Sequence, residues 1–146
     1  MKGHIRKQLL AEFIRRVWDD GYTDAADEFI AETYTIHHDP GDPWDGMALN
    51  LTGFQDRVAK SRAAFPDQRF HTQGLFEDGD CVVMTWQWSA THLGDLPGFP
   101  ASRQTIHMSG ATVYMFNDDD RITGHWQITD RLGVYQQLQR NSAGGK

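Results

Sequence analysis

The sequence predicts an α+β domain in which helices pack on a strongly curved, mainly antiparallel sheet. Three observations support this prediction. Apolar residues in the first third recur with the period of a helix, those after residue 66 alternate with the period of a strand, and turn residues separate the strand-like runs. With 146 residues, a single domain spanning residues 1–146 is expected, large enough to bury a core and a small cavity.

Four helices are expected. Residues 5–19 carry one apolar stripe, made of Leu9, Leu10, Phe13, Ile14, Val17 and Trp18. Thr23 can cap a short second helix. A third helix begins near Thr52, which has the spacing of a capping box with Gln55, and it ends at Pro66. A closing helix holds Leu132, Val134, Tyr135 and Leu138.

Runs with a period of two predict the strands at residues 33–38, 68–76, 81–91, 104–116 and 122–128. Turn chemistry predicts the loop at 39–43 and the tight turns between the later strands. Because side chains alternate across a sheet, Met84, Trp86 and Trp88 share one face, but the alternation does not tell which face lines the interior. Residues 141–146 are expected to form a flexible polar tail.

Composition excludes several classes of function. The net charge of −6 disfavours a nucleic-acid partner, which requires a basic surface. No apolar run reaches the length of a membrane-spanning helix, so no membrane partner is expected. The first residues lack the apolar core of a signal peptide, and the single Cys81 leaves no internal disulfide. These features favour a cytoplasmic protein.

Aromatic and titratable side chains are concentrated in the last third of the chain, on the expected strands. The sequence holds 5 Trp and 7 His, more than a domain of this size needs merely to fold. Gathered on a curved sheet, such residues indicate a lined pocket. An apolar pocket with a few polar groups is what a small organic ligand needs.

Several short motifs follow one another along nearly the whole chain. They are Val17-Trp18-Asp19-Asp20-Gly21 with Ala25-Ala26, Tyr34 with His38-Asp39-Pro40, Ala64-Phe65-Pro66-Asp67, Asp78-Gly79-Asp80, Thr91-His92-Leu93-Gly94, His125-Trp126 with Asp130, and Leu132-Gly133 with Gln136-Gln137-Leu138. In this order and spacing they resemble the SnoaL-like polyketide cyclase family of the NTF2-like superfamily. The resemblance implies a cone-shaped sheet covered by the N-terminal helices. Pro100-Ala101-Ser102 departs from the Pro-Thr-Gly loop that is frequent in the family.

The resemblance implies an enzyme that closes a ring by intramolecular aldol condensation, without metal or cofactor. A carboxylate whose pKa is raised by an apolar pocket can take the proton of a methylene between two carbonyls, while a neighbouring acid protonates the acceptor carbonyl. The same fold leaves isomerisation, dehydration and epoxide hydrolysis open. Epoxide hydrolysis would need an Asp-Arg-Asp set, for which Arg103 and Arg121 are poorly placed. A non-catalytic ligand-binding module is the remaining alternative.

The candidates for catalysis are Asp130, His125, His107 and His38. Asp130 matches the family's Asp after the His-Trp pair, but it also stands directly before the final helix, where it would serve as an N-cap with a lowered pKa. Each histidine could protonate a carbonyl or orient the substrate, and hydrogen bonding within the sheet is its alternative role.

The expected pocket walls are Trp86, Trp88, His92, Met108, Trp126 and Phe99. Alternation turns some of them to the other side of the sheet, and an outward Trp suggests a homodimer through the sheet. We therefore expect two partners, a small apolar carbonyl-bearing ligand and a second copy of the chain. No metal site is expected, because the sequence has no HExxH motif, although His38, Asp39, His107 and His125 could converge from the strands.

Overall fold

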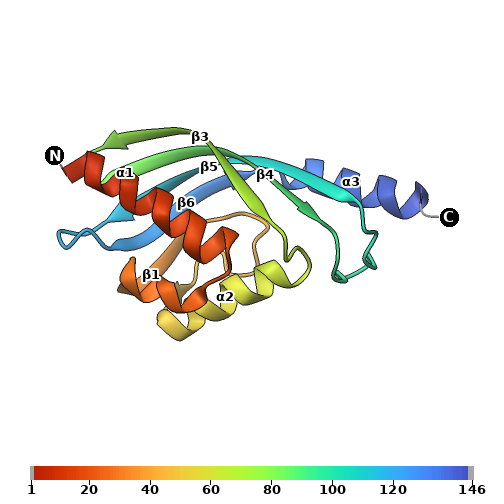
Figure 1. Cartoon of the computed structure of the whole chain (residues 1–146), viewed down its shortest axis with the longest axis horizontal. Helices are drawn as coiled ribbons and strands as arrows, with labels where there is room; N and C mark the ends of the chain where they lie inside the picture. Colours follow the sequence, from red (N-terminus) through yellow and green to blue (C-terminus); the bar gives the residue numbers. More distant parts are fainter. Residues whose placement is uncertain (1, 145–146) are drawn as a thin grey trace.

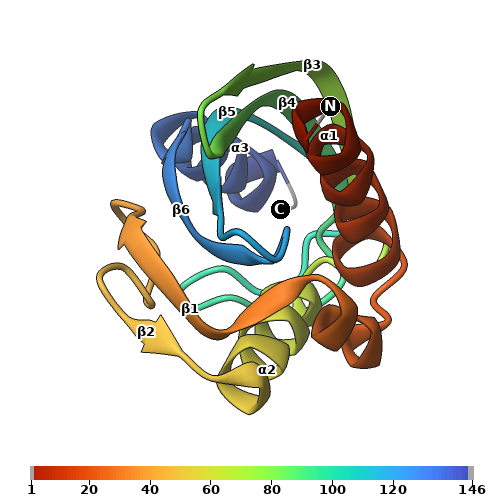
Figure 2. The ribbon, with the colours of Figure 1, turned by 90° about the vertical axis from the view of Figure 1, so that its left-hand side faces the viewer.

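The computed structural model describes residues 2–144, and it confirms the predicted α+β class (Figure 1). One curved sheet has the strand order β2-β1-β6-β5-β4-β3. The sheet curls so far that β1 and β3 lie on opposite sides of the interior, and helices α1 and α2 cover its open side (Figure 2). No helix within the described residues has the length and apolar character needed to cross a membrane.

The first predicted helix is present, but its last turns are wider than those of an α-helix. Helix α1 (Lys2–Phe13) continues without a break into a π-helical segment, η1 (Ile14–Asp19). The guanidinium of Arg62 donates to the carbonyls of Trp18 at 2.5 Å and Asp19 at 2.8 Å, and so satisfies the end of this segment. Such widened turns are frequent at functional sites, and this one carries Trp18 to the interior.

The next two helices are found where they are expected, with different caps. Segment η2 (Thr23–Glu28) is a 3₁₀-helix without a side-chain cap. Helix α2 (Leu51–Ala63) is capped by Asn50, whose side-chain oxygen accepts from the backbone N–H of Gly53 at 2.8 Å. The predicted capping box at Thr52 is therefore wrong by two residues, because Asn50 already supplies the acceptor that the first turn needs.

The strands are β1 (Ile30–His38), β2 (Ala48–Leu49), β3 (Arg69–Asp78), β4 (Cys81–Thr91), β5 (Thr105–Phe116) and β6 (Ile122–Thr129). The last four form the predicted antiparallel meander. Strand β1 runs parallel to β6, with Ile36 opposite His125 and His38 opposite Trp126. This pairing joins the end of β1 to the middle of β6, two segments that are far apart in the sequence.

Helix α3 (Arg131–Gly144) takes the place of β6 beside the first residues of β5. Strand β6 stops pairing at Gly110, which leaves the backbone of His107 open on that side. The side-chain amide of Gln137 fills the gap, accepting from the His107 N–H at 2.8 Å and donating to its carbonyl at 2.7 Å. Residues 141–144 of the predicted tail are thus helical, whereas 145–146 lie outside the described residues.

Candidate functional site

The interior of the cone holds a cavity of about 410 Å³. Aromatic and aliphatic side chains form most of its wall, and they come from every layer of the fold: Trp18, Trp44, Phe65, Phe70, Trp86, Trp88, Leu96, Met108, Tyr114 and Val134. Six of the polar lining residues belong to one connected group, namely Tyr34, Asp42, Arg57, His125, Gln127 and Arg131, and the others are Lys60, Ser61, Gln68 and Thr129. The cavity therefore has the size and the mixed character of a site for a small organic ligand.

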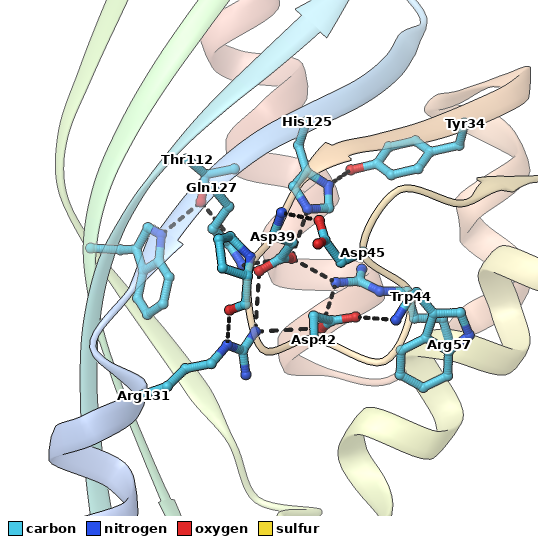
Figure 3. Close-up of polar contacts among 12 residues, drawn as sticks. Tyr34, Asp39, Asp42, Trp44, Asp45, Arg57, Thr112, His125, Gln127 and Arg131 are labelled. Carbon is cyan, nitrogen blue, oxygen red and sulfur yellow. Dashed lines mark hydrogen bonds and ion pairs between the residues drawn. The ribbon is translucent and has the colours of Figure 1, made fainter.

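A single carboxylate, that of Asp39, organises the polar part of the wall from behind (Figure 3). Its side chain is fully buried. Four donors reach it, namely His125 Nε2 at 2.9 Å, Gln127 Nε2 at 3.1 Å, Arg131 Nη2 at 3.1 Å and Arg57 Nη2 at 3.4 Å. We call Asp39, Asp42, Arg57, His125, Gln127 and Arg131 the Asp39 cluster.

The parallel pairing of β1 with β6 explains why Asp39 arrives at this point. Tyr34 and Ile36 are buried, so simple alternation would turn His38 inward as well. The pairing with β6 instead shifts register between Ile36 and His38, which is typical of a bulge. The shift sends His38 to the outer face and brings the next residue, Asp39, behind the inward side chains of β6.

The formal charges of the Asp39 cluster balance. Arg57 stands between two carboxylates, 3.4 Å from Asp39 and 3.3 Å from Asp42, and Arg131 contacts the same two. The guanidinium of Arg57 also lies over the rings of Trp18 and Trp44, at 5.3 Å and 5.8 Å from their centroids. Two carboxylates and two guanidiniums leave no uncompensated charge in this buried group.

The pKa of Asp39 is lowered. Burial alone would raise it, but the hydrogen bond from His125 and the positive charges of Arg57 and Arg131 more than offset that effect. Asp39 is therefore a carboxylate at neutral pH. Because every donor around it already points at its oxygens, it positions its neighbours and is not itself open to a ligand.

His125 is held as a neutral imidazole between two partners. Burial lowers its pKa more than the hydrogen bond to Asp39 raises it. Its Nδ1 lies 2.6 Å from the hydroxyl of Tyr34, whose pKa burial raises well above the ordinary value, so that hydroxyl keeps its proton and donates it. The proton of the neutral ring is thus assigned to Nε2, facing Asp39, and the lone pair to Nδ1.

A second chain of hydrogen bonds orients Gln127. The indole N–H of Trp86 donates to the Thr112 hydroxyl at 2.9 Å, which donates to the Gln127 amide oxygen at 2.6 Å. The amide nitrogen of Gln127 is therefore the end that faces Asp39. Hydrogen bonds in this way connect one side chain from each of β4, β5 and β6 to the carboxylate of Asp39.

The structure brings four of the sequence-predicted site residues to the cavity. His125 enters it from β6, and Trp86, Trp88 and Met108 line it from β4 and β5. Trp86 and Trp88 are buried on the inner face together with Met84, as their shared strand face allows. The alternation along β4 thus identifies the wall that faces the helices.

Three of the residues predicted to be catalytic lie elsewhere. Asp130 is exposed, and its carboxylate accepts from the Gly133 N–H at 2.9 Å as the N-cap of α3. His107 is exposed on β5. His38 stacks on Trp126 with 4.8 Å between ring centroids. None of the three side chains lines the cavity. His107 and His38 lie on the outer face of their strands, and Asp130 caps helix α3.

Three of the predicted binding residues also lie away from the cavity wall. Trp126 has 42% of its surface exposed on the outer side of β6. His92 is buried under the loop before β5, where its Nδ1 lies 3.3 Å from the Ser102 hydroxyl. Phe99 packs edge-on against Tyr135 of α3, at 5.7 Å between centroids. His92 and Phe99 therefore hold the loop that leads into β5.

Sequence reasoning missed most of the Asp39 cluster. Arg57 carried a usable signal, because it stands on the inner face of α2 between the buried Phe54 and Val58, where a solvated charge does not belong. Gln127 shares the parity of His125 on β6. Asp39 is among the side chains that the sequence allows to converge with His125, whereas Asp42 and Arg131 lie in a loop and at a helix start and give no signal. Among residues 2–144, no group of three or more His, Cys, Asp or Glu side chains is arranged to hold a metal ion.

Comparisons with known proteins agree with this architecture. The family model of the SnoaL-like polyketide cyclases matches residues 8–138. A candidate polyketide cyclase from Acidithiobacillus ferrooxidans is 57% identical, with 97% of this chain and 96% of that chain covered and a TM-score of 0.90. Among proteins with curated descriptions, none matches this sequence.

More distant solved structures share the fold. IdmH, a candidate polyketide cyclase from Streptomyces antibioticus, is 24% identical, with 92% of this chain and 98% of its own covered and a TM-score of 0.76. AclR, a candidate hydroxylase from Streptomyces galilaeus, is 16% identical, with 94% and 82% covered and a TM-score of 0.78. Because the family model spans most of the sequence and the structure from Acidithiobacillus ferrooxidans nearly all of it, the chain belongs to the SnoaL-like polyketide cyclase family.

Proposed function

We propose that this protein is a cytoplasmic enzyme that performs cofactor-free acid/base chemistry on a small, largely apolar, carbonyl-bearing ligand, closing a ring by intramolecular aldol condensation. One observation carries the proposal. A neutral imidazole, that of His125, lines an apolar cavity with its Nε2 on a buried carboxylate and its Nδ1 lone pair on a tyrosine hydroxyl. This is the arrangement of a positioned general base.

In the proposed reaction, the C–H bond between two carbonyls breaks and its proton passes to the oxygen of Tyr34, while the Tyr34 proton passes to His125 Nδ1. The electron pair of the C–H bond moves into an enolate, and Asp39 stabilises the imidazolium that forms. The enolate carbon then bonds to the second carbonyl carbon. The alkoxide produced there takes a proton back from Tyr34, which recovers its own from His125, so that no proton is gained or lost.

The apolar wall supports the same reaction in two ways. It excludes water from the enolate, and its aromatic surfaces hold a flexible substrate folded, so that the reacting carbons meet. Trp88 packs edge-on against Phe65, Trp86 and Trp18 both pack edge-on against Phe70, and all five rings line the cavity. Aromatic walls of this kind suit a planar polyketide-like ligand.

Proton abstraction can be tested separately from ring closure. An aromatic methyl β-keto ester is incubated with the protein in D₂O, and NMR follows the loss of its α-proton signal as deuterium replaces the proton. The rate of this loss measures how fast the base removes the proton. We expect His125→Asn to slow this exchange by about 100-fold or more, the usual contribution of a positioned base. His71→Asn removes an exposed imidazole and serves as the matched control with an unchanged rate. Equal rates in wild type and His125→Asn would reject the proposal.

One observation favours a second candidate reaction, epoxide hydrolysis. Arg57 stands between Asp39 and Asp42, which is the Asp-Arg-Asp set that such a reaction requires, supplied from α2 and the loop after β1. Asp42 lines the cavity, whereas Asp39 does not, so Asp42 is the carboxylate to which this reaction assigns the activation of a water molecule. Incubation of styrene oxide in ¹⁸O water decides the matter. Formation of an ¹⁸O-labelled diol by the wild type but not by Asp42→Asn supports epoxide hydrolysis. If the wild type forms no such diol, epoxide hydrolysis is rejected.

We also propose that a second copy of the chain covers the outer face of β6. Trp126 and Ile128 on this strand and Leu132 and Tyr135 on the following helix are large apolar residues with 42% to 66% of their surface exposed. Exposed apolar groups that follow one another along the chain in this way are typical of an interface. Sedimentation of the wild type as a dimer, and of Trp126→Glu as a monomer, is the expected result. A monomeric wild type would overturn the proposal.

A further inference from the structure

The hydroxyl of Tyr114 is a donor in the cavity without a partner. Tyr114 lies on β5 directly opposite His125 on β6, and the two ring centroids are 6.1 Å apart. The residue is 6% exposed and lines the cavity. No hydrogen bond joins its hydroxyl to any residue that the structure describes.

The other polar groups on this side of the cavity are already engaged. The Tyr34 hydroxyl donates to His125, the Gln127 amide is held by Thr112 and Asp39, and the indole N–H of Trp86 donates to Thr112. The Arg57 Nε and Thr129 Oγ1 atoms also lack partners, but they are closed off from solvent. The Tyr114 hydroxyl, unlike these two atoms, is not fully closed off, so a ligand in the cavity can reach it.

The chemistry of this hydroxyl defines what it can bind. Burial raises the pKa of Tyr114 above the ordinary value for a tyrosine, so the group stays protonated and neutral. A buried hydroxyl without an acceptor is unfavourable, and a ligand oxygen would satisfy it. A carbonyl oxygen that becomes an enolate oxygen is the acceptor whose hydrogen bond strengthens most during proton removal.

We propose that the Tyr114 hydroxyl donates a hydrogen bond to the ligand's carbonyl oxygen and stabilises the negative charge that develops there when the adjacent His125–Tyr34 pair removes the proton. This assignment rests on the proposed function, since it gives that reaction its second polar contact. It places the ligand's reacting carbonyl over the inner face of the sheet, beside the paired residues Tyr114 and His125, with the Tyr34 hydroxyl of β1 next to the proton that leaves.

Tyr114→Phe removes only the hydroxyl and keeps the ring that packs near Phe13. In the α-proton exchange reaction, we expect kcat to fall by about 100-fold, the usual effect of deleting one oxyanion donor, while KM changes less. Tyr22→Phe, which removes the hydroxyl of an exposed tyrosine that does not line the cavity, is the matched control and retains the wild-type rate.

A binding measurement tests Tyr114 without requiring turnover. The probe pair is 1-tetralone and tetralin, two bicyclic molecules that differ by one carbonyl oxygen. The wild type should bind 1-tetralone more tightly than tetralin by about 3- to 10-fold, the effect of one net hydrogen bond. The infrared carbonyl stretch of bound 1-tetralone should also move to lower wavenumber. In Tyr114→Phe both the preference and the shift should disappear, whereas Tyr34→Phe should keep the shift.

The outcomes separate the two proposals. A wild type that shows no preference for the ketone, or a Tyr114→Phe variant that keeps the carbonyl shift, overturns the assignment of Tyr114. A Tyr114-dependent shift combined with exchange that does not depend on His125 supports Tyr114 as the carbonyl-binding residue and rejects the proposed base. A Tyr114→Phe variant with the wild-type fold by circular dichroism but without the shift supports the assignment directly.

Discussion

Oδ2 of Asp39 and Nε2 of His125 lie 2.9 Å apart, in a pair whose two side chains are both withdrawn from solvent. The pair joins the end of β1 to β6 across most of the sequence. Asp39 fixes which ring nitrogen of His125 carries the proton, and Tyr34 covers the other nitrogen. The orientation of the base therefore depends on a carboxylate that does not itself line the cavity.

Replacement of Asp39 by Asn should separate the effect of the carboxylate charge from the effect of the side chain's shape. Asn keeps the shape but removes the charge that holds the imidazolium, so α-proton exchange should slow by about 100-fold. Removing one member of a buried ionic group also destabilises the fold, by about 3 kcal/mol in chemical denaturation. Asp42→Asn is the control, because Asp42 shares both arginines with Asp39 but does not contact His125. Equal losses in the two variants would contradict the positioning role.

The pH dependence of activity should follow His125. Its folded-state pKa is lowered by burial, so the neutral, proton-accepting ring persists to a pH below the ordinary histidine value of about 6.5. The rate of exchange should stay level from neutral pH down past 6.5 and fall only below it. A pH–rate profile of kcat/KM measures this limb, and a midpoint above 6.5 would contradict the lowered pKa.

The free energy of unfolding should decrease as the pH falls, because the lowered pKa values of His125 and Asp39 both act in this direction. Below about pH 6.5, the unfolded chain binds a proton at residue 125 that the folded protein resists, so the free energy of unfolding decreases. The lowered pKa of Asp39 adds stability above its unfolded value of about 3.9, and this contribution disappears as the pH falls through the folded value. Urea unfolding between pH 8 and 4 should show the first loss, and His125→Gln should remove that part alone.

The sequence predicted the meander well because its signals are local. Burial alternates along β4 and along most of β5, and tight turns join β3 to β4 and β5 to β6. The parallel pairing of β1 with β6 is non-local, and β2 has only 2 residues, too few for any period to be visible. These two features place Asp39 and its loop, so the part of the fold that builds the site was the part least encoded in local pattern.

Strand parity held more information about the site than motif resemblance did. His125, Gln127 and Thr129 alternate with Trp126, Ile128 and Asp130, so a base at His125 and a base at Asp130 could not both face the interior. The resemblance favoured Asp130, whereas the structure places its carboxylate on the first turn of α3. For β1 the same rule fails, because the register shift before His38 exchanges the faces, and nothing in the local sequence marks that shift.

Asp130 should therefore matter for stability more than for proton transfer. Asp130→Ala removes the acceptor of the Gly133 N–H and should lower the free energy of unfolding by about 1 kcal/mol. Asp130→Asn keeps an efficient cap and should lose far less. Both variants should retain most of the α-proton exchange rate. If Asp130→Asn instead abolished exchange while the protein stayed folded, Asp130 and not His125 would be the base.

Gly124 should prove sensitive because it determines how closely β1 approaches β6. A Cβ at this position would overlap the backbone carbonyl oxygen of Thr35, so Gly124→Ala must push the two strands apart. The displacement falls next to His125 and would lengthen its hydrogen bond to Asp39. We expect a loss of about 1–3 kcal/mol in stability, the range for overpacking. The loss of exchange activity should exceed that of Asp130→Ala, whose loss of stability matches the lower end of this range. Exchange at the wild-type rate in folded Gly124→Ala would show that the chemistry tolerates a displaced Asp39, against the positioning argument.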